Sequence, residues 1–226
     1  MARVVVRHPS LPAFQPLSLR AFLPPSFLAF QPPSLFLCYH PPMPSHLPFD
    51  VRRRLKPIRL LVLDVDGVLT DGSLMYGAEG CIGKSFNVRD GLGIRLLMEC
   101  GITVAVISGR SEKAVSARLA ELGLEPSVVA LGSRDKVEDL SRIQAAAGGI
   151  EDGQTAVIGD DLPDLPILLR AGFSACPADA APDVAAVCDL VCGSPGGHGA
   201  VREVAEVILK GQGRWSDLVQ GWMGTR

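Results

Sequence analysis

The chain has little net charge, few aromatic residues and no cysteine pair of the CxxC type. Its formal net charge is −2 and its aromatic content is 5%. A near-neutral balance does not provide the strongly basic surface that nucleic acids or anionic membranes attract, so we expect neither as a partner. The six cysteines lack the spacing and the histidine partners of a zinc site. We therefore expect free thiols and a reducing, cytoplasmic location.

Glycine is absent from the first 57 residues, which hold none of the 24 glycines but 12 of the 18 prolines. Prolines at this density interrupt helices, and they break any apolar run well short of the ~20 residues of a membrane span. We interpret residues 1–57 as a disordered extension, or as the product of a start codon placed too early, with Met43 as the true start. A targeting segment is the alternative, because the extension contains arginines and a single acid, Asp50.

After this extension, short apolar runs alternate with helical patterns. Strands are expected over 58–63, 102–107, 128–131, 155–158, 173–175 and 190–192, and helices over 91–100, 111–122, 135–147 and 201–210. Ser111 is expected to cap the second helix. Alternating strands and helices indicate parallel βαβ units. The sequence therefore predicts one α/β domain with a doubly wound parallel sheet over 58–213, followed by a tail, 214–226.

Two acids one residue apart follow the first expected strand. Asp64 and Asp66 stand at its carboxyl end, where ligands bind in open parallel sheets, and Gly67 lets the backbone turn away. Neighbouring carboxylates repel each other unless a cation neutralises them, and Mg²⁺ prefers oxygen ligands. One carboxylate could attack phosphorus to form an aspartyl-phosphate, while the other acts as general acid and base. The alternative is an ordinary turn rich in Asp and Gly.

A second group of acids follows the strand expected at 155–158. Asp160, Asp161 and Asp164 would bring a further metal ligand to the same rim of the sheet. The alternative is a purely structural role at the start of a helix, where the helix dipole favours acidic residues.

Two other strand ends carry polar groups that suit a phosphoryl group. Ser108 offers a hydroxyl near a helix start, and Lys136 could neutralise charge at the nucleophile. Either residue alone is a weak signal, since most lysines lie on the protein surface.

The order of these motifs resembles the haloacid dehalogenase (HAD) superfamily of phosphatases. The matching segments are DVDGVLTDG at 64–72, SGR at 108–110, Lys136 and GDDLPD at 159–164. Two further segments, SFNVRDGLGI at 85–94 and GGHGAVRE at 196–203, are similar to the sugar-acid phosphatases of that superfamily. The resemblance implies a HAD-like Rossmannoid fold with a minimal cap, in which 73–87 form a β-hairpin flap.

The resemblance also implies roles for individual residues. Asp64 would be the nucleophile and Asp66 the general acid and base, with Mg²⁺ held by Asp64, the Asp66 carbonyl and Asp160. Ser108 and Lys136 would hold the phosphoryl group. The remaining members of the implied site are the substrate-binding residues Gly67, Thr70 and Arg89 and the orienting residues Asp161 and Asp164.

The implied substrate is a small phosphorylated sugar acid, 3-deoxy-D-manno-octulosonate 8-phosphate, an intermediate of lipopolysaccharide synthesis. A homotetramer would cover the uncapped site with neighbouring subunits. His198 departs from the pattern, in which a basic residue is usual, and this bears on substrate identity. The alternatives are a nonulosonate 9-phosphate phosphatase, a non-catalytic HAD-like partner domain of a sugar-nucleotide synthetase and a phospho-accepting receiver domain.

Overall fold

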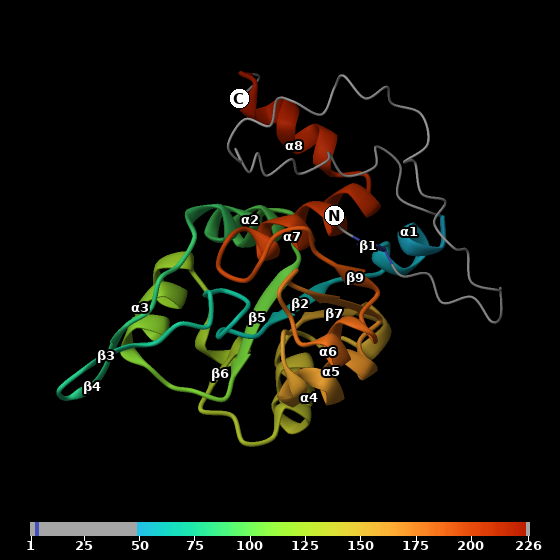
Figure 1. Cartoon of the computed structure of the whole chain (residues 1–226). Coiled ribbons are helices and arrows are strands. Elements are labelled where there is room, and N and C mark those ends of the chain that lie inside the picture. Colours follow the sequence, from blue (N-terminus) through green and yellow to red (C-terminus); the bar gives the residue numbers. More distant parts are fainter. Residues whose placement is uncertain (1–2, 5–48, 225–226) are drawn as a thin grey trace, which may run out of the picture.

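The computed structural model describes residues 3–4 and 49–224, in which seven strands form one sheet (Figure 1). The strands lie in the order β1-β9-β8-β7-β2-β5-β6, and all neighbours are parallel except β1 and β9. Their bounds are β1 Arg3–Val4, β2 Leu60–Leu63, β5 Thr103–Ser108, β6 Val129–Leu131, β7 Thr155–Ile158, β8 Phe173–Cys176 and β9 Leu190–Val191. The predicted parallel α/β sheet is confirmed.

Helices cover both faces of this sheet because its central strands are apolar on both sides. In β2, Leu61 and Leu63 enter one core, while Leu60 and Val62 enter the other. The first core packs against α1 Phe49–Leu55, α2 Val88–Glu99, α3 Lys113–Leu122 and α7 Ala200–Gly211, and the second against α4 Lys136–Ala146, α5 Leu165–Arg170 and α6 Pro182–Ala185. Both layers of helices are visible in Figure 1.

The order in which successive strands join the sheet reverses at the central strand β2. From β2 the chain adds β5 and β6 on one side, and it then crosses through α4 to place β7 on the other side of β2. The loops that leave β2 and β7 therefore depart towards opposite faces, which opens a crevice at their carboxyl ends. Leu63 is paired with Ile158 in the register, so the residues after both strands emerge together.

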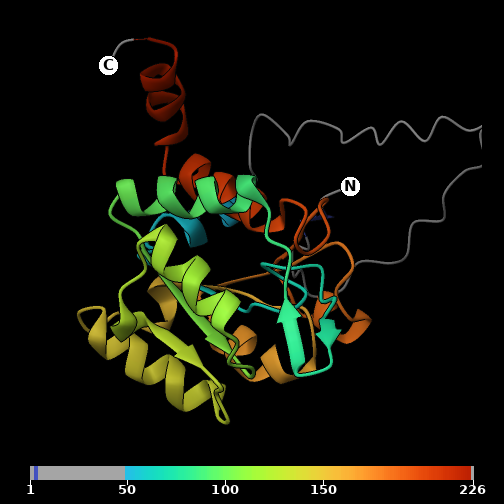
Figure 2. The ribbon, with the colours of Figure 1, turned by 90° about the vertical axis from the view of Figure 1, so that its left-hand side faces the viewer.

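A two-stranded hairpin stands apart from the sheet, as was expected for 73–87. It consists of β3 Met75–Gly77 and β4 Gly80–Gly83, and it carries the exposed apolar side chains Met75, Tyr76 and Ile82. Figure 1 shows the hairpin projecting from the body of the domain, and Figure 2 shows α8, Trp215–Trp222, projecting away from the sheet. Among residues 49–224, no helix combines the length and apolar character that a membrane span needs.

The folded part begins before the expected boundary at residue 58. Strand β1 and helix α1 both lie within the segment that was expected to be disordered. Strand β1 pairs with β9, and Val51 and Leu55 of α1 are buried in the core against α7. The rest of that expectation, over 5–48, falls outside the described residues. Ser111 was wrongly expected to cap a helix, because α3 starts at Lys113 with Glu112 in the capping position.

Candidate active site

Three acids meet in the crevice between β2 and β7. Asp64 follows β2, and its amide donates a hydrogen bond to the Ile158 carbonyl at 3.1 Å, which holds it beside the end of β7. Asp160 and Asp164 follow β7. One carboxylate oxygen from each of the three acids lies within 4.8 Å of the others. Asp64 and Asp164 are buried, with 8% and 2% of their surface exposed. The structure thus brings the two predicted acid groups together.

Gly67 allows Asp160 to approach the first loop closely. Its φ of +82° lies in the left-handed region, and a Cβ atom at this position would stand 2.1 Å from Asp160 Oδ2. Any other residue would therefore combine a strained backbone with a clash against the carboxylate. The absence of a side chain at Gly67 therefore allows the Asp160 carboxylate to take its place in the acid cluster.

Asp164 organises the second loop with both of its carboxylate oxygens. Oδ1 accepts from Lys136 at 2.6 Å, while Oδ2 accepts from the amides of Asp160 and Asp161 at 3.1 and 3.4 Å. Asp161 is exposed and caps the short helix that follows, because its own carboxylate accepts from the Leu162 amide at 2.8 Å. Of the two residues expected to orient the site, Asp164 contacts its other members directly.

Lys136 lies between two of the acids as the first residue of α4. Its ammonium group donates to Asp64 Oδ1 and to Asp164 Oδ1, each at 2.6 Å. Burial by itself lowers the pKa of Lys136, but attraction to Asp64 and then to Asp164 outweighs burial, so the pKa lies above its ordinary value. Lys136 is therefore a fixed positive charge at the expected nucleophile.

The acid cluster carries more negative charge than Lys136 can neutralise. Burial, followed by repulsion from Asp164, raises the pKa of Asp64 to about 6. Burial, followed by repulsion from Asp64, raises the pKa of Asp160 to about 7. Three carboxylates that face one ammonium group, two of them buried, fit a divalent cation with oxygen ligands, which would hold all three ionised.

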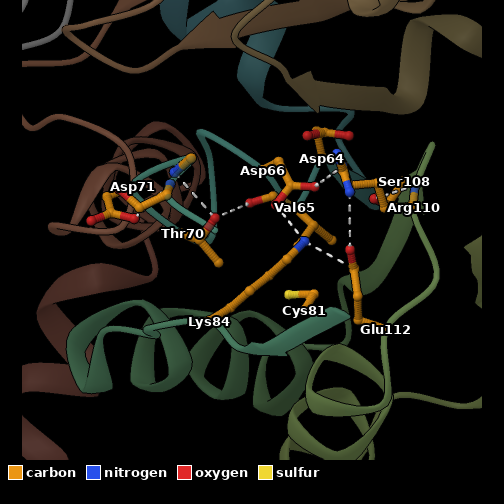
Figure 3. Close-up of polar contacts among 12 residues, drawn as sticks. Asp64, Val65, Asp66, Thr70, Asp71, Cys81, Lys84, Ser108, Arg110 and Glu112 are labelled. Carbon is orange, nitrogen blue, oxygen red and sulfur yellow. Dashed lines mark hydrogen bonds and ion pairs between the residues drawn. The ribbon is translucent and has the colours of Figure 1, made fainter. Parts of the chain in front are cut away.

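Asp66 points to a separate group of charges (Figure 3). Its Oδ1 lies 2.5 Å from Lys84 Nζ, and its Oδ2 lies 3.9 Å from Arg110 Nε. Lys84 also forms an ion pair at 2.9 Å with Glu112. Sequence reasoning missed Lys84, Glu112 and Arg110 as neighbours of Asp66, because no spacing along the chain links the hairpin to the start of α3.

The remaining predicted residues take different positions. Ser108 ends β5, is 2% exposed and accepts a hydrogen bond from the Arg110 amide through its hydroxyl at 3.3 Å. Thr70 is fully buried, and its hydroxyl donates to the Val65 carbonyl at 3.2 Å, so it stabilises the loop where substrate contact was expected. Arg89 is exposed in the first turn of α2, and among the described residues no ion pair joins its side chain to the acids.

An uncapped doubly wound sheet with acids after β2 and β7 and a lysine on α4 is the arrangement of a HAD-type phosphatase. No family model matches the chain. It is 43% identical over 175 residues to 3-deoxy-D-manno-octulosonate 8-phosphate phosphatase KdsC of Haemophilus influenzae, which covers 76% of this chain and 96% of that protein. The enzyme of the same name from Escherichia coli K12 is 41% identical over 180 residues, covering 80% and 92%. The chain belongs to the 3-deoxy-D-manno-octulosonate 8-phosphate phosphatase family.

Solved structures agree with this assignment. The crystal structure of the Moraxella catarrhalis phosphatase of this name, in complex with magnesium, phosphate and KDO, has a TM-score of 0.73 and 40% identity, covering 76% of this chain and 98% of that one. The cobalt-bound Haemophilus influenzae structure has a TM-score of 0.72 and 44% identity, covering 75% and 99%.

Proposed function

We propose that this protein hydrolyses the phosphomonoester 3-deoxy-D-manno-octulosonate 8-phosphate with the help of Mg²⁺. The observation that carries the proposal is the contact of Lys136 with Asp64 inside a cluster of three acids, in a chain that shares 43% identity with a phosphatase of this name. A buried carboxylate next to a fixed ammonium group suits nucleophilic attack on a phosphate ester.

The acids define where the ion would be held. Asp64, Asp160 and the main-chain carbonyl of Asp66 are the proposed ligands, and Asp164 lies close enough to support them. When bound, Mg²⁺ would screen the repulsion between the phosphate dianion and the carboxylates and would polarise a phosphoryl oxygen.

The residues of the chain supply the chemical steps. A carboxylate oxygen of Asp64 attacks phosphorus, and the bond from phosphorus to the sugar oxygen breaks. Asp66, in its protonated form, gives its proton to the leaving sugar oxygen. Asp66 then takes a proton from water as that water attacks phosphorus, and the bond to Asp64 breaks to release inorganic phosphate. Lys136 and Ser108 hold the phosphoryl oxygens during both steps.

Substrate binding, assembly and location complete the proposal. Gly67 presents its backbone to the phosphoryl group, and Arg89 binds the sugar carboxylate or a neighbouring subunit. A homotetramer would cover the open site, and the exposed apolar side chains Met75, Tyr76 and Ile82 on the hairpin support such a contact. A cytoplasmic location is supported by the free cysteines of the described residues.

The test is phosphate release from the full chain with a panel of eight-carbon and nine-carbon sugar-acid phosphates, with and without Mg²⁺. We expect strong preference for the eight-carbon ester, dependence on Mg²⁺ and a loss of ~10⁴-fold or more in Asp64→Asn. Asp183→Asn, an exposed acid in the first turn of α6, is the matched control and should retain activity. Preference for a nine-carbon ester would contradict the substrate, and no hydrolysis of any ester would contradict the proposed activity.

A further inference from the structure

Lys84 is a lysine whose side chain is 0% exposed although it lies at the base of an otherwise exposed hairpin. It follows directly after β4, and its side chain runs inward to Asp66 (Figure 3). The ammonium group lies 2.5 Å from Asp66 Oδ1 and 2.9 Å from Glu112 Oε2. A buried ammonium group is unfavourable unless it is paired, and here two carboxylates pair with it.

Four charges form a closed and electrically balanced group around Asp66. Lys84 contacts one carboxylate oxygen of Asp66, and Arg110 lies 3.9 Å from the other. Glu112 pairs with both cations, at 2.9 Å from Lys84 and 3.6 Å from Arg110. Two cations and two anions cancel while Asp66 is ionised, so this group needs no further ion, and when Asp66 carries its proton Lys84 stays paired with Glu112. It therefore differs from the acid cluster at Asp64, which has an excess of negative charge.

Lys84 and Arg110 differ in how far their side chains are exposed to solvent, and this difference indicates different roles. The side chain of Arg110 is 48% exposed, whereas that of Lys84 is fully enclosed. An exposed side chain at 3.9 Å is free to move, while an enclosed one held by two carboxylates has a single arrangement. Lys84 is thus the contact that fixes where the Asp66 carboxylate lies.

We propose that Lys84 is a positioning residue that holds Asp66 in place for proton transfer, and that Glu112 holds Lys84. The inference rests on the proposed function, in which Asp66 protonates the leaving sugar oxygen. Proton transfer requires the carboxyl group within hydrogen-bond reach of that oxygen, so a carboxylate that is free to rotate would meet it less often. Lys84 itself touches neither the acid cluster nor, on this proposal, the reacting atoms.

Lys84→Met tests the contact, because methionine fills a similar volume without charge. We expect kcat for the sugar-acid ester to fall ~10–100-fold, as is typical when a supporting contact of a site residue is removed, with KM and the Mg²⁺ requirement changed less than about threefold. In Asp66→Asn, which already lacks the acid, adding Lys84→Met should cost little more. Non-additivity of this kind marks two residues that act as a unit.

The leaving group gives an independent readout. A sugar alcohol needs a proton to leave, whereas the nitrophenolate of p-nitrophenyl phosphate leaves without one. Hydrolysis of the aspartyl-phosphate, in which Asp66 acts as base, is common to both esters, so the comparison uses kcat/KM, which covers only the steps up to departure of the leaving group. Lys84→Met should lower kcat/KM much more for the sugar ester than for the aryl ester. A purely structural loss would lower kcat/KM equally for both substrates, and it would add fully to Asp66→Asn.

Lys113→Met is the matched control, since Lys113 is an exposed lysine beside Glu112 that makes no contact with Asp66. It should behave as the parent protein. Glu112→Gln keeps Lys84 in the chain and serves as a second variant if Lys84→Met unfolds; we expect a smaller loss of kcat with the same leaving-group pattern. An active parent in which these variants match Lys113→Met, or lower kcat/KM equally for both esters, would overturn this inference alone. A parent inactive on every ester would overturn the proposed function instead.

Discussion

At the scale of single residues, Gly67 is the position at which the two loops of the site depend on each other. Its left-handed backbone and the missing Cβ atom both matter, because Asp160 Oδ2 occupies the space that a side chain would need. Gly72 lies in the same loop with a similar φ of +76°, but a Cβ there would have its nearest atom at 3.7 Å. Comparing the two glycines therefore distinguishes the effect of backbone strain from that of a clash with Asp160, a ligand of the proposed metal site.

We predict that Gly72→Ala lowers the free energy of unfolding by about 1–3 kcal/mol, the usual cost of a left-handed non-glycine residue, and that Gly67→Ala lowers it by at least as much because its Cβ atom also displaces Asp160. Only Gly67→Ala should also weaken Mg²⁺ binding, by ~10-fold or more, because Asp160 must move. Thermal unfolding and isothermal titration calorimetry measure the two effects. Equal Mg²⁺ affinities in both variants would show that Asp160 does not depend on this approach.

At the scale of elements, helix α7 is capped by a residue from another helix. Gly199 stands in its capping position and offers no side chain, and Asp90 from α2 accepts hydrogen bonds from the amides of Gly199 and Arg202 at 3.2 and 2.8 Å. The loop before α7 packs against the first active-site loop, where the Gly197 amide donates to the Val68 carbonyl at 3.0 Å. The cap therefore joins α2, α7 and the site.

Asp90→Ala should lower the free energy of unfolding by about 1.5–3 kcal/mol, because it leaves one buried and one part-buried amide without their charged acceptor. It should also lower kcat, since the loop at Gly197 supports the loop that carries Asp64. Urea unfolding and steady-state kinetics measure both effects. Asp217→Ala, which removes an exposed acid from the first turn of α8, is the control and should cost less than about 1 kcal/mol. Equal losses in the two variants would contradict this coupling.

At the scale of the whole molecule, the acid cluster links stability to pH and to metal. The folded-state pKa values of Asp64 and Asp160, about 6 and about 7, lie above the ordinary value of 3.8. The folded protein thus holds protons that the unfolded chain releases. The metal-free protein is therefore expected to lose stability as the pH rises from about 4 towards 7.

A divalent cation should reverse this loss, because it binds the ionised acids. We predict that saturating Mg²⁺ raises Tm more at pH 8 than at pH 5, with a gain of about 2.7 kcal/mol when its concentration is 100 times Kd. Thermal unfolding at both pH values, with Mg²⁺ or with a chelator, provides the measurement. Asp160→Asn should remove most of the difference. The same Mg²⁺ effect at both pH values would argue against the cluster as the binding site.

The sheet could be predicted from sequence because its strands are short apolar runs that are buried on both faces. The strand expected at 155–158 matches β7, and the others agree to within a few residues. Helix α1 was missed because, over residues 50–55, Val51 and Leu55 are the buried apolar residues, among three arginines and between two prolines. Its burial depends on α7, which is distant in sequence, so no local pattern indicates it.

The acids of the site were predictable for a similar reason, since each follows a strand whose carboxyl end is visible in the sequence. Lys136 was predictable only through its place in the order of motifs. Lys84 had no such signal, because its contact with Asp66 depends on how the residue after β4 approaches the loop after β2, and no spacing along the chain indicates that approach. Thr70 was assigned to the substrate on motif position alone, and its hydroxyl instead serves its own loop.

The pairing of β2 with β7 has a consequence for how the protein folds. Asp64 and Asp160 follow neighbouring strands, β2 and β7, yet β5, β6 and the intervening helices lie between these two strands along the chain. Contacts between such distant segments carry a large loop-closure entropy and form slowly. The chain must therefore form its central sheet before the acid cluster exists. A bound ion can then stabilise the folded protein, but it cannot nucleate folding.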